Sequence, residues 1–128
     1  MIKGIEHIGI CSKDTEALKN WYIKLFQLKV VYENAKSPRT YFLALKDGSM
    51  IEIYPSDAGS ESVDNKTQGI RHLAFIPENF EEMSKILVNG GVEIVEASKT
   101  SPSGVKTLFF KDPEGNIIHL IDRPVPLI

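Results

Sequence analysis

The chain contains two short stretches that look like copies of one another. Gly4-Ile5-Glu6-His7-Ile8 recurs as Gly69-Ile70-Arg71-His72-Leu73, so His7 and His72 lie sixty-five positions apart (72 − 7). A second pair of stretches closes each copy, Gly48-Ser49-Met50-Ile51-Glu52 and Gly115-Asn116-Ile117-Ile118-His119, at an offset of sixty-seven positions (119 − 52). The sequence therefore predicts an internal repeat with a two-residue insertion and a potential metal ligand at the same two places in each copy.

Each copy has the pattern of one helix and four strands. In the first copy, strands are expected over residues 4–11, 28–34, 39–46 and 49–54, with a helix after the N-cap Asp14. In the second, strands are expected over 69–76, 92–97, 105–110 and 117–121, with a helix between Asn79 and Gly90. We predict an α+β fold in which residues 1–128 form one domain. It would consist of two β-α-β-β-β repeats (about 3–54 and 69–122) joined by the polar linker 55–68.

Alternation along the strands divides each predicted sheet into two faces. The face beneath the helix is predicted to carry apolar side chains, namely Ile8, Ile10, Ile51 and Ile53 in the first copy and Leu73, Phe75, Ile118 and Leu120 in the second. His7, Glu52, His72 and His119 then all fall on the opposite face. Any one of these histidines, taken singly, is more often a hydrogen-bonded core residue than a ligand. Three histidines and one glutamate at repeat-equivalent positions favour a metal site, because imidazole and carboxylate suit a divalent transition ion.

Composition narrows the class of protein. With 128 residues, a net charge of −2 and a pI of about 5.9, the chain has a real core and no electrostatic footprint for nucleic acid or an anionic membrane. No apolar run approaches the ~18–20 residues that span a bilayer, and the first residues lack the apolar run of a signal peptide. A cytoplasmic protein is expected. The single cysteine, Cys11, lies in an apolar strand and is interpreted as a buried packing thiol.

These motifs resemble the vicinal oxygen chelate superfamily, which includes glyoxalase I, extradiol dioxygenases and the fosfomycin- and bleomycin-resistance proteins. The resemblance covers about residues 3–122. It is carried by Ile5-Glu6-His7-Ile8-Gly9-Ile10, Trp21-Tyr22, Ile51-Glu52-Ile53, Ile70-Arg71-His72-Leu73-Ala74-Phe75 and Phe110-Lys111-Asp112-Pro113-Glu114-Gly115-Asn116-Ile117-Ile118-His119-Leu120. It implies that the paired modules form an open eight-stranded cup that holds a divalent metal, usually in a homodimer.

The resemblance also assigns roles to residues. His7, Glu52 and His72 match three metal-ligand positions of small bacterial glyoxalase I-like proteins, and His119 matches the fourth, where those proteins usually have Glu. It implies a metal-dependent lyase or isomerase of the lactoylglutathione lyase type, which converts a small oxygen-chelating substrate through an enediolate. Glu52 or His119 would move the proton. Nickel or zinc is the expected ion, with cobalt, manganese or iron as alternatives.

Two other readings stay open. One is a metal-dependent transferase or hydrolase like the fosfomycin-resistance proteins, and the other is a non-catalytic protein that sequesters a small planar ligand, as bleomycin-resistance proteins do. The sequence shows no convincing basic pair for glutathione carboxylates, for which Arg39, Arg71 and Lys106 are candidates only. Arg71 alternates away from His72 and is interpreted as a surface or dimer-contact residue. Beyond the ligands, alternation suggests a pocket lining of Tyr41, Tyr54, Phe109 and Ile121.

Overall fold

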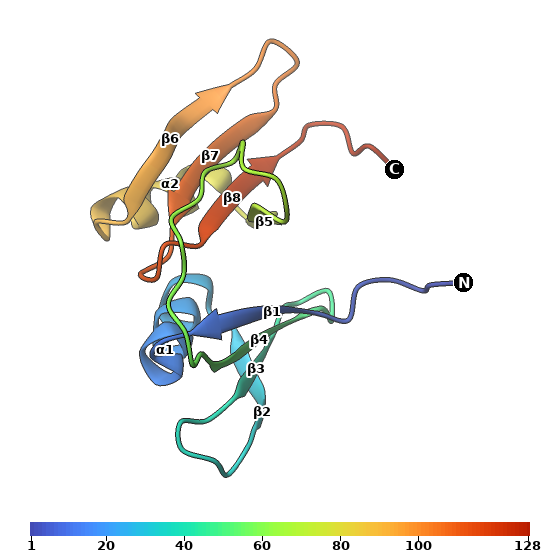
Figure 1. The fold of residues 1–128 in the computed structure, drawn as a ribbon. Helices are drawn as coiled ribbons and strands as arrows, with labels where there is room; N and C mark the ends of the chain where they lie inside the picture. Colours follow the sequence, from blue (N-terminus) through green and yellow to red (C-terminus); the bar gives the residue numbers. More distant parts are fainter. The chain divides into compact units, whose positions relative to one another are not determined.

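The structure, a computed structural model, describes residues 1–128 and divides into two compact units, Met1–Ser60 and Glu61–Ile128. Each unit contains one copy of the β-α-β-β-β order (Figure 1). The first unit consists of β1 (His7–Ser12), α1 (Thr15–Phe26), β2 (Lys29–Glu33), β3 (Tyr41–Ala44) and β4 (Met50–Pro55). The second consists of β5 (His72–Phe75), α2 (Phe80–Asn89), β6 (Glu93–Thr100), β7 (Lys106–Lys111) and β8 (Ile117–Asp122). The predicted α+β class and repeat are confirmed.

Each unit has its own four-stranded sheet with the same topology. The strand order is β1-β4-β3-β2 in the first unit and β5-β8-β7-β6 in the second. The first and last strands of each copy pair in parallel, and the other neighbours pair antiparallel. Because β1 lies beside β4, and β5 beside β8, residues distant in sequence become neighbours on one face.

The two helices begin where the sequence predicts. The Asp14 side chain accepts a hydrogen bond from the Ala17 N–H at 3.0 Å, and the Asn79 side chain accepts one from the Glu82 N–H at 2.9 Å. The first helix, α1, packs against β3 and β4 (Figure 1). The second helix, α2, ends at Gly90, and Gly91 follows with a φ of 73°. Neither helix is long and apolar enough to cross a membrane.

The cores lie between each helix and its sheet, with two departures from the prediction. Ile10, Ile51 and Ile53 are buried as expected, whereas Ile8 is 37% exposed. Cys11 is exposed, so its interpretation as a buried thiol is wrong. Both residues lie on β1, which is an edge strand of its sheet and has a neighbour on one side only.

The carboxylate of Asp112 holds the turn into β8 by accepting several hydrogen bonds. Asp112 is buried, and its Oδ1 accepts hydrogen bonds from the Glu114 N–H at 2.9 Å and the Asn116 N–H at 3.0 Å. Its Oδ2 accepts another from Asn116 Nδ2 at 2.8 Å. Gly115 adopts a φ of 88°, which favours glycine. The Asp-Pro-Glu-Gly-Asn motif therefore has a structural role, which is to set the entry of the strand that carries His119.

Candidate metal-binding site

The first unit brings His7 and Glu52 together on the face opposite α1. In the parallel pairing of β1 with β4, Gly9 is the partner of Glu52 and His7 is the partner of Met50. The His7 Nε2 and Glu52 Oε1 atoms are 3.9 Å apart. A Cβ on Gly9 would lie 3.5 Å from Glu52 Oε1 and 3.1 Å from Tyr54 Cε1, so the missing side chain leaves room for both over β1.

The other ring nitrogen of His7 is already engaged. Its Nδ1 bonds the Glu6 carboxylate. That hydrogen bond, with further attraction from Glu6 and Glu52, raises the pKa of the His7 imidazole above its ordinary value, against a smaller opposing effect of desolvation. With Nδ1 donating to Glu6, Nε2 is the nitrogen that faces Glu52.

The second unit brings His72 and His119 together across β5 and β8. Their ring centroids are 5.3 Å apart and their planes are 89° apart. His119 stacks on Phe109, with centroids 3.9 Å apart and planes 10° from parallel. Burial lowers the pKa of His119, and the nearby His72 and Arg123 lower it further. At neutral pH the His119 imidazole is therefore neutral, as a metal ligand or a base must be.

The three imidazoles share one feature, which is an Nε2 atom without a hydrogen bond. In His119, which is only 9% exposed, this Nε2 is buried and has no partner. In His72, Nδ1 lies 3.0 Å from the Asn65 side-chain oxygen, and in His7 it lies at Glu6. Buried polar atoms are nearly always satisfied, so the unpaired Nε2 of His119 indicates a missing partner.

The donor chemistry of each pair fits a divalent transition ion. Two ligands of a tetrahedral ion with bonds of about 2.1 Å lie about 3.4 Å apart, close to the observed separation of His7 Nε2 and Glu52 Oε1. Within either unit, no group of three or more histidine, cysteine or acidic side chains lies close enough to hold an ion. Each unit, taken by itself, thus supplies two donors.

Aromatic rings flank the donors at equivalent positions of the two copies. Phe42 is the antiparallel partner of Glu52, and Phe109 is the partner of His119. The Phe42 and His7 rings pack edge to face with their centroids 5.4 Å apart, and the Phe109 and His72 rings do the same at 5.3 Å. Sequence reasoning missed Phe42 and selected Tyr41, which the register places opposite Ile53 on the helix side. The signal available in the sequence was the equivalence of Phe42 to Phe109.

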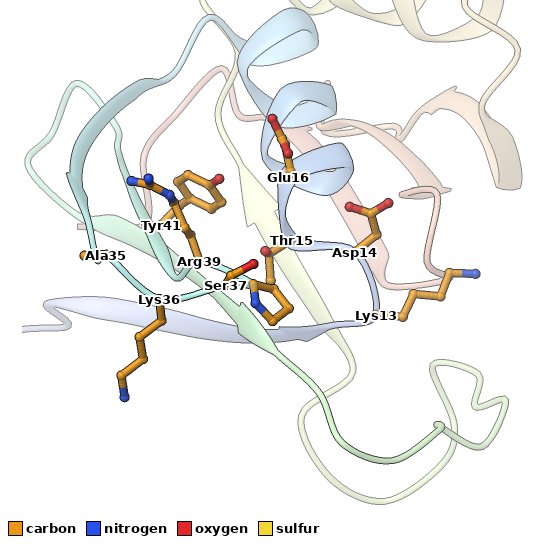
Figure 2. Close-up of a pocket in the computed structure, with 10 residues that line it drawn as sticks. Lys13, Asp14, Thr15, Glu16, Ala35, Lys36, Ser37, Arg39 and Tyr41 are labelled. Carbon is orange, nitrogen blue, oxygen red and sulfur yellow. The ribbon is translucent and has the colours of Figure 1, made fainter.

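A pocket in the first unit lies apart from these donors. It has a volume of about 510 Å³ and is lined by the start of α1 and the connection between β2 and β3, including Thr15, Arg39 and Tyr41 (Figure 2). Burial, followed by the charge of Glu16, raises the pKa of the Tyr41 hydroxyl. Neither His7 nor Glu52 lines this pocket, so its chemistry is separate from theirs.

The basic candidates are unequally available. Arg39 donates to the Asn34 carbonyl at 3.2 Å and lies 3.5 Å from Glu33. Lys106 is paired with Glu81. Arg71, by contrast, has its Nε and Nη1 atoms buried without hydrogen-bond partners. Arg39 and Lys106 are thus each engaged with a neighbouring side chain or carbonyl, whereas Arg71 holds two buried guanidinium nitrogens without a partner.

Comparison with protein families gives a match over nearly the whole chain. Residues 4–120 match the model of the Glyoxalase/Bleomycin resistance protein/Dioxygenase superfamily. A curated relative, the uncharacterized protein YwkD of Bacillus subtilis (strain 168), is 29% identical over 128 residues, which cover 96% of this chain and 99% of YwkD.

Solved structures agree with the family match. A glyoxalase family protein from Enterococcus faecalis is 30% identical, with a TM-score of 0.76 over 94% of this chain and 98% of the other. A lactoylglutathione lyase from Agrobacterium tumefaciens has a TM-score of 0.71 over 94% and 93% of the two chains, at 17% identity. At that identity the second likeness shows the fold alone.

Proposed function

The chain belongs to the glyoxalase/bleomycin resistance protein/dioxygenase superfamily, and from that premise we propose that it is a metal-dependent lyase or isomerase of the glyoxalase type. The observation that supports this is the donor pair in each unit, His7 with Glu52 and His72 with His119. We propose that the two repeats act as one domain, in a homodimer, and that these four side chains hold one ion, nickel or zinc before cobalt, manganese or iron.

The substrate would be a small molecule with two neighbouring oxygen atoms. Bound at the four donors, the ion would supply Lewis-acid chemistry, which acidifies the adjacent C–H bond. Glu52 and His119 would move the proton, since a carboxylate and a neutral imidazole are both competent bases near neutral pH. His119 stands where related proteins usually have Glu, so this ligand set carries one negative charge fewer.

The basic side chains available to a substrate limit how many negative groups it can carry. A glutathione conjugate carries two carboxylates, and each needs a cation that is free to bind it. Arg39 and Lys106 are already bonded to neighbours. A substrate without two carboxylates therefore suits this chain better than a glutathione conjugate.

The metal part of the proposal is tested by calorimetric titration of metal-stripped protein with nickel, zinc, manganese and iron(II). We expect one tight site in the wild-type protein and its loss in His72→Ala and in His7→Ala. Nickel or zinc would direct further work to isomerase assays, and iron(II) to oxygenase assays. If none of the four ions bound, the metal-dependent proposal would be wrong.

The catalytic part is tested on a panel of hemithioacetals made from small 2-oxoaldehydes. We expect Glu52→Gln and His119→Ala each to lower kcat/KM by about 10²–10⁴-fold, the usual contribution of a positioned acid–base group. Glu61→Gln is the matched control, because Glu61 is an exposed carboxylate in the segment before β5. Unchanged turnover in both site variants would remove Glu52 and His119 from the chemistry.

A second candidate function is the metal-independent binding of a planar molecule. It is supported by the aromatic side chains on the His7 face of the first unit, where Tyr32 and Phe42 meet edge to face at 5.8 Å and Tyr32 is 56% exposed. Such a surface stacks well against a flat ring. A binder would keep its affinity for a planar ligand in the presence of a chelator, whereas the enzyme would lose its turnover.

A further inference from the structure

The segment between the two copies carries a side chain that contacts His72. Asn65 lies in the polar stretch 55–68, which the sequence marks only as a linker, and its Oδ1 atom lies 3.0 Å from His72 Nδ1. An amide oxygen only accepts hydrogen bonds, so the imidazole Nδ1 must donate. The proton is then on Nδ1, and the lone pair that binds a metal is on Nε2.

Asn65 is presented by a folded turn. Asp64 Oδ1 accepts hydrogen bonds from the Lys66 N–H at 2.9 Å and from the Thr67 hydroxyl at 3.2 Å. The Asp64 carbonyl also accepts from the Thr67 N–H at 3.2 Å. These bonds lower the pKa of the Asp64 carboxyl, the Lys66 N–H first. The turn fixes the backbone on both sides of Asn65, which reduces the entropy lost when its amide is held at His72.

In the first copy, a carboxylate takes the place that the Asn65 amide has in the second. There the Nδ1 of His7 is bonded by the carboxylate of its own neighbour, Glu6. The position equivalent to Glu6 in the second copy is Arg71, which cannot accept a hydrogen bond. Asn65 supplies from the linker the acceptor that the second copy lacks beside its histidine.

We propose that Asn65 is a positioning residue, which holds His72 in the Nδ1–H form with Nε2 directed to the metal, so that the linker forms part of the site. The role assigned to Asn65 rests on the proposed metal-binding function. The hydrogen bond itself can be tested without any metal. Partners of this kind around ligating histidines typically change metal affinity by about 10–100-fold.

The experiment compares Asn65→Leu, which removes the acceptor, with Asn65→Asp, which keeps one. Asn89→Leu is the matched control, since Asn89 is an exposed amide at the end of α2. The first readout is the ¹⁵N spectrum of the metal-free protein above the imidazole pKa, in which the two tautomers have distinct nitrogen shifts. We expect His72 in the Nδ1–H form in the wild type, Asn65→Asp and Asn89→Leu, and a shift towards Nε2–H in Asn65→Leu alone, with His7 unchanged.

The second readout is the affinity for nickel and zinc, measured by calorimetry. We expect Asn65→Leu to bind about 10–100-fold more weakly and Asn65→Asp to restore binding. An unchanged His72 tautomer in Asn65→Leu, or equal metal affinity of Asn65→Leu and wild type, would overturn the inference. Failure of the wild type to bind any metal would instead refute the proposed function and the purpose assigned to Asn65, while the spectra would still decide whether Asn65 sets the tautomer.

Discussion

Phe109 and His119 stack nearly parallel, at a centroid distance of 3.9 Å, on adjacent antiparallel strands. The Phe109 ring covers one side of an imidazole whose Nε2 is buried and unpaired. Because burial is the main cause of the lowered pKa of His119, the stack helps to keep this imidazole neutral.

Removal of the stack should therefore raise the pKa of His119. In Phe109→Ala we expect the His119 pKa to move up towards its ordinary value, because solvent reaches the cationic form. The measurement is an NMR titration of the imidazole signals. Phe42→Ala is the matched control, since Phe42 holds the equivalent position beside His7, and it should leave the His119 titration unchanged. Equal shifts in both variants would contradict a local effect.

Protein stability should depend on pH through His119. Its folded-state pKa is below the unfolded value, so the unfolded chain takes up the proton first as the pH falls below about 6.5. The free energy of unfolding should decrease from there until the pH passes below the folded pKa. Urea denaturation from pH about 8 to about 5 measures this decrease, and His119→Gln should make it smaller.

The contribution of His7 to the free energy of unfolding changes with pH in the opposite direction. Its pKa is raised in the folded state, so its contribution is fully present below the unfolded pKa and is lost as the pH rises through the folded pKa. His7→Gln should therefore steepen the loss of stability in acid. If His7→Gln and His119→Gln changed the loss of stability in acid in the same direction, the pKa shifts assigned to these two histidines would be contradicted.

Glu6 should control the titration of His7. The hydrogen bond from His7 Nδ1 to Glu6 is the first cause of the raised pKa, so Glu6→Gln should lower the His7 pKa towards its ordinary value. NMR titration of His7 measures the change. Glu61→Gln removes a carboxylate from the exposed segment before β5 and should have no effect on His7.

Gly9 should matter for metal binding more than for folding. An added Cβ would lie 3.1 Å from Tyr54 Cε1, which is tight, and 3.5 Å from Glu52 Oε1, which is ordinary contact. Gly9→Ala should therefore displace the Tyr54 ring slightly and place an apolar methyl group against the Glu52 carboxylate. We expect metal affinity to fall about tenfold, as for other changes around a ligand, with a small change in the melting temperature. Gly59→Ala is the control, because nothing lies within 4 Å of its added Cβ. Wild-type affinity in Gly9→Ala would mean that the open space over Gly9 is not needed for metal binding.

The hydrogen bonds that the Asp112 carboxylate accepts should contribute to the free energy of unfolding. Asp112→Ala leaves the N–H groups of Glu114 and Asn116 without their acceptor, and we expect a loss of about 3 kcal/mol in the free energy of unfolding. Urea denaturation measures it. Asp57→Ala, at an exposed carboxylate, should change the same quantity by less than about 0.5 kcal/mol. A small effect at Asp112 would mean that the turn is held mainly by its backbone.

Much of the fold was predictable because the same order of strands and helix occurs twice in the sequence. The repeat, the helix caps at Asp14 and Asn79 and the separation of each sheet into two faces all follow from local patterns, and the structure confirms them. The errors at Ile8 and Cys11 arose because alternation gives the face of a strand residue but not how well that face is covered. An edge strand such as β1 leaves part of both faces open.

The candidate site was less predictable than the fold. Alternation put His7, Glu52, His72 and His119 on one kind of face, and register then brought each pair together. Glu6 and Asn65 could not be found in this way, because hydrogen bonds to a histidine side chain leave no periodic pattern. Asn65 was hidden further by its place in a polar stretch, where composition alone indicates a turn or a linker.

The parallel pairing of β1 with β4, and of β5 with β8, bears on how such a chain can diverge. An insertion of one residue within β4 or β8 would turn its donor towards the helix, since successive side chains alternate between faces. Residues added in a connecting loop leave the donor where it is. The two copies differ by two residues between their first and second donors, and both donor pairs are kept. A loop between two donors can thus be lengthened, and can offer new contacts to a ligand, without moving either donor.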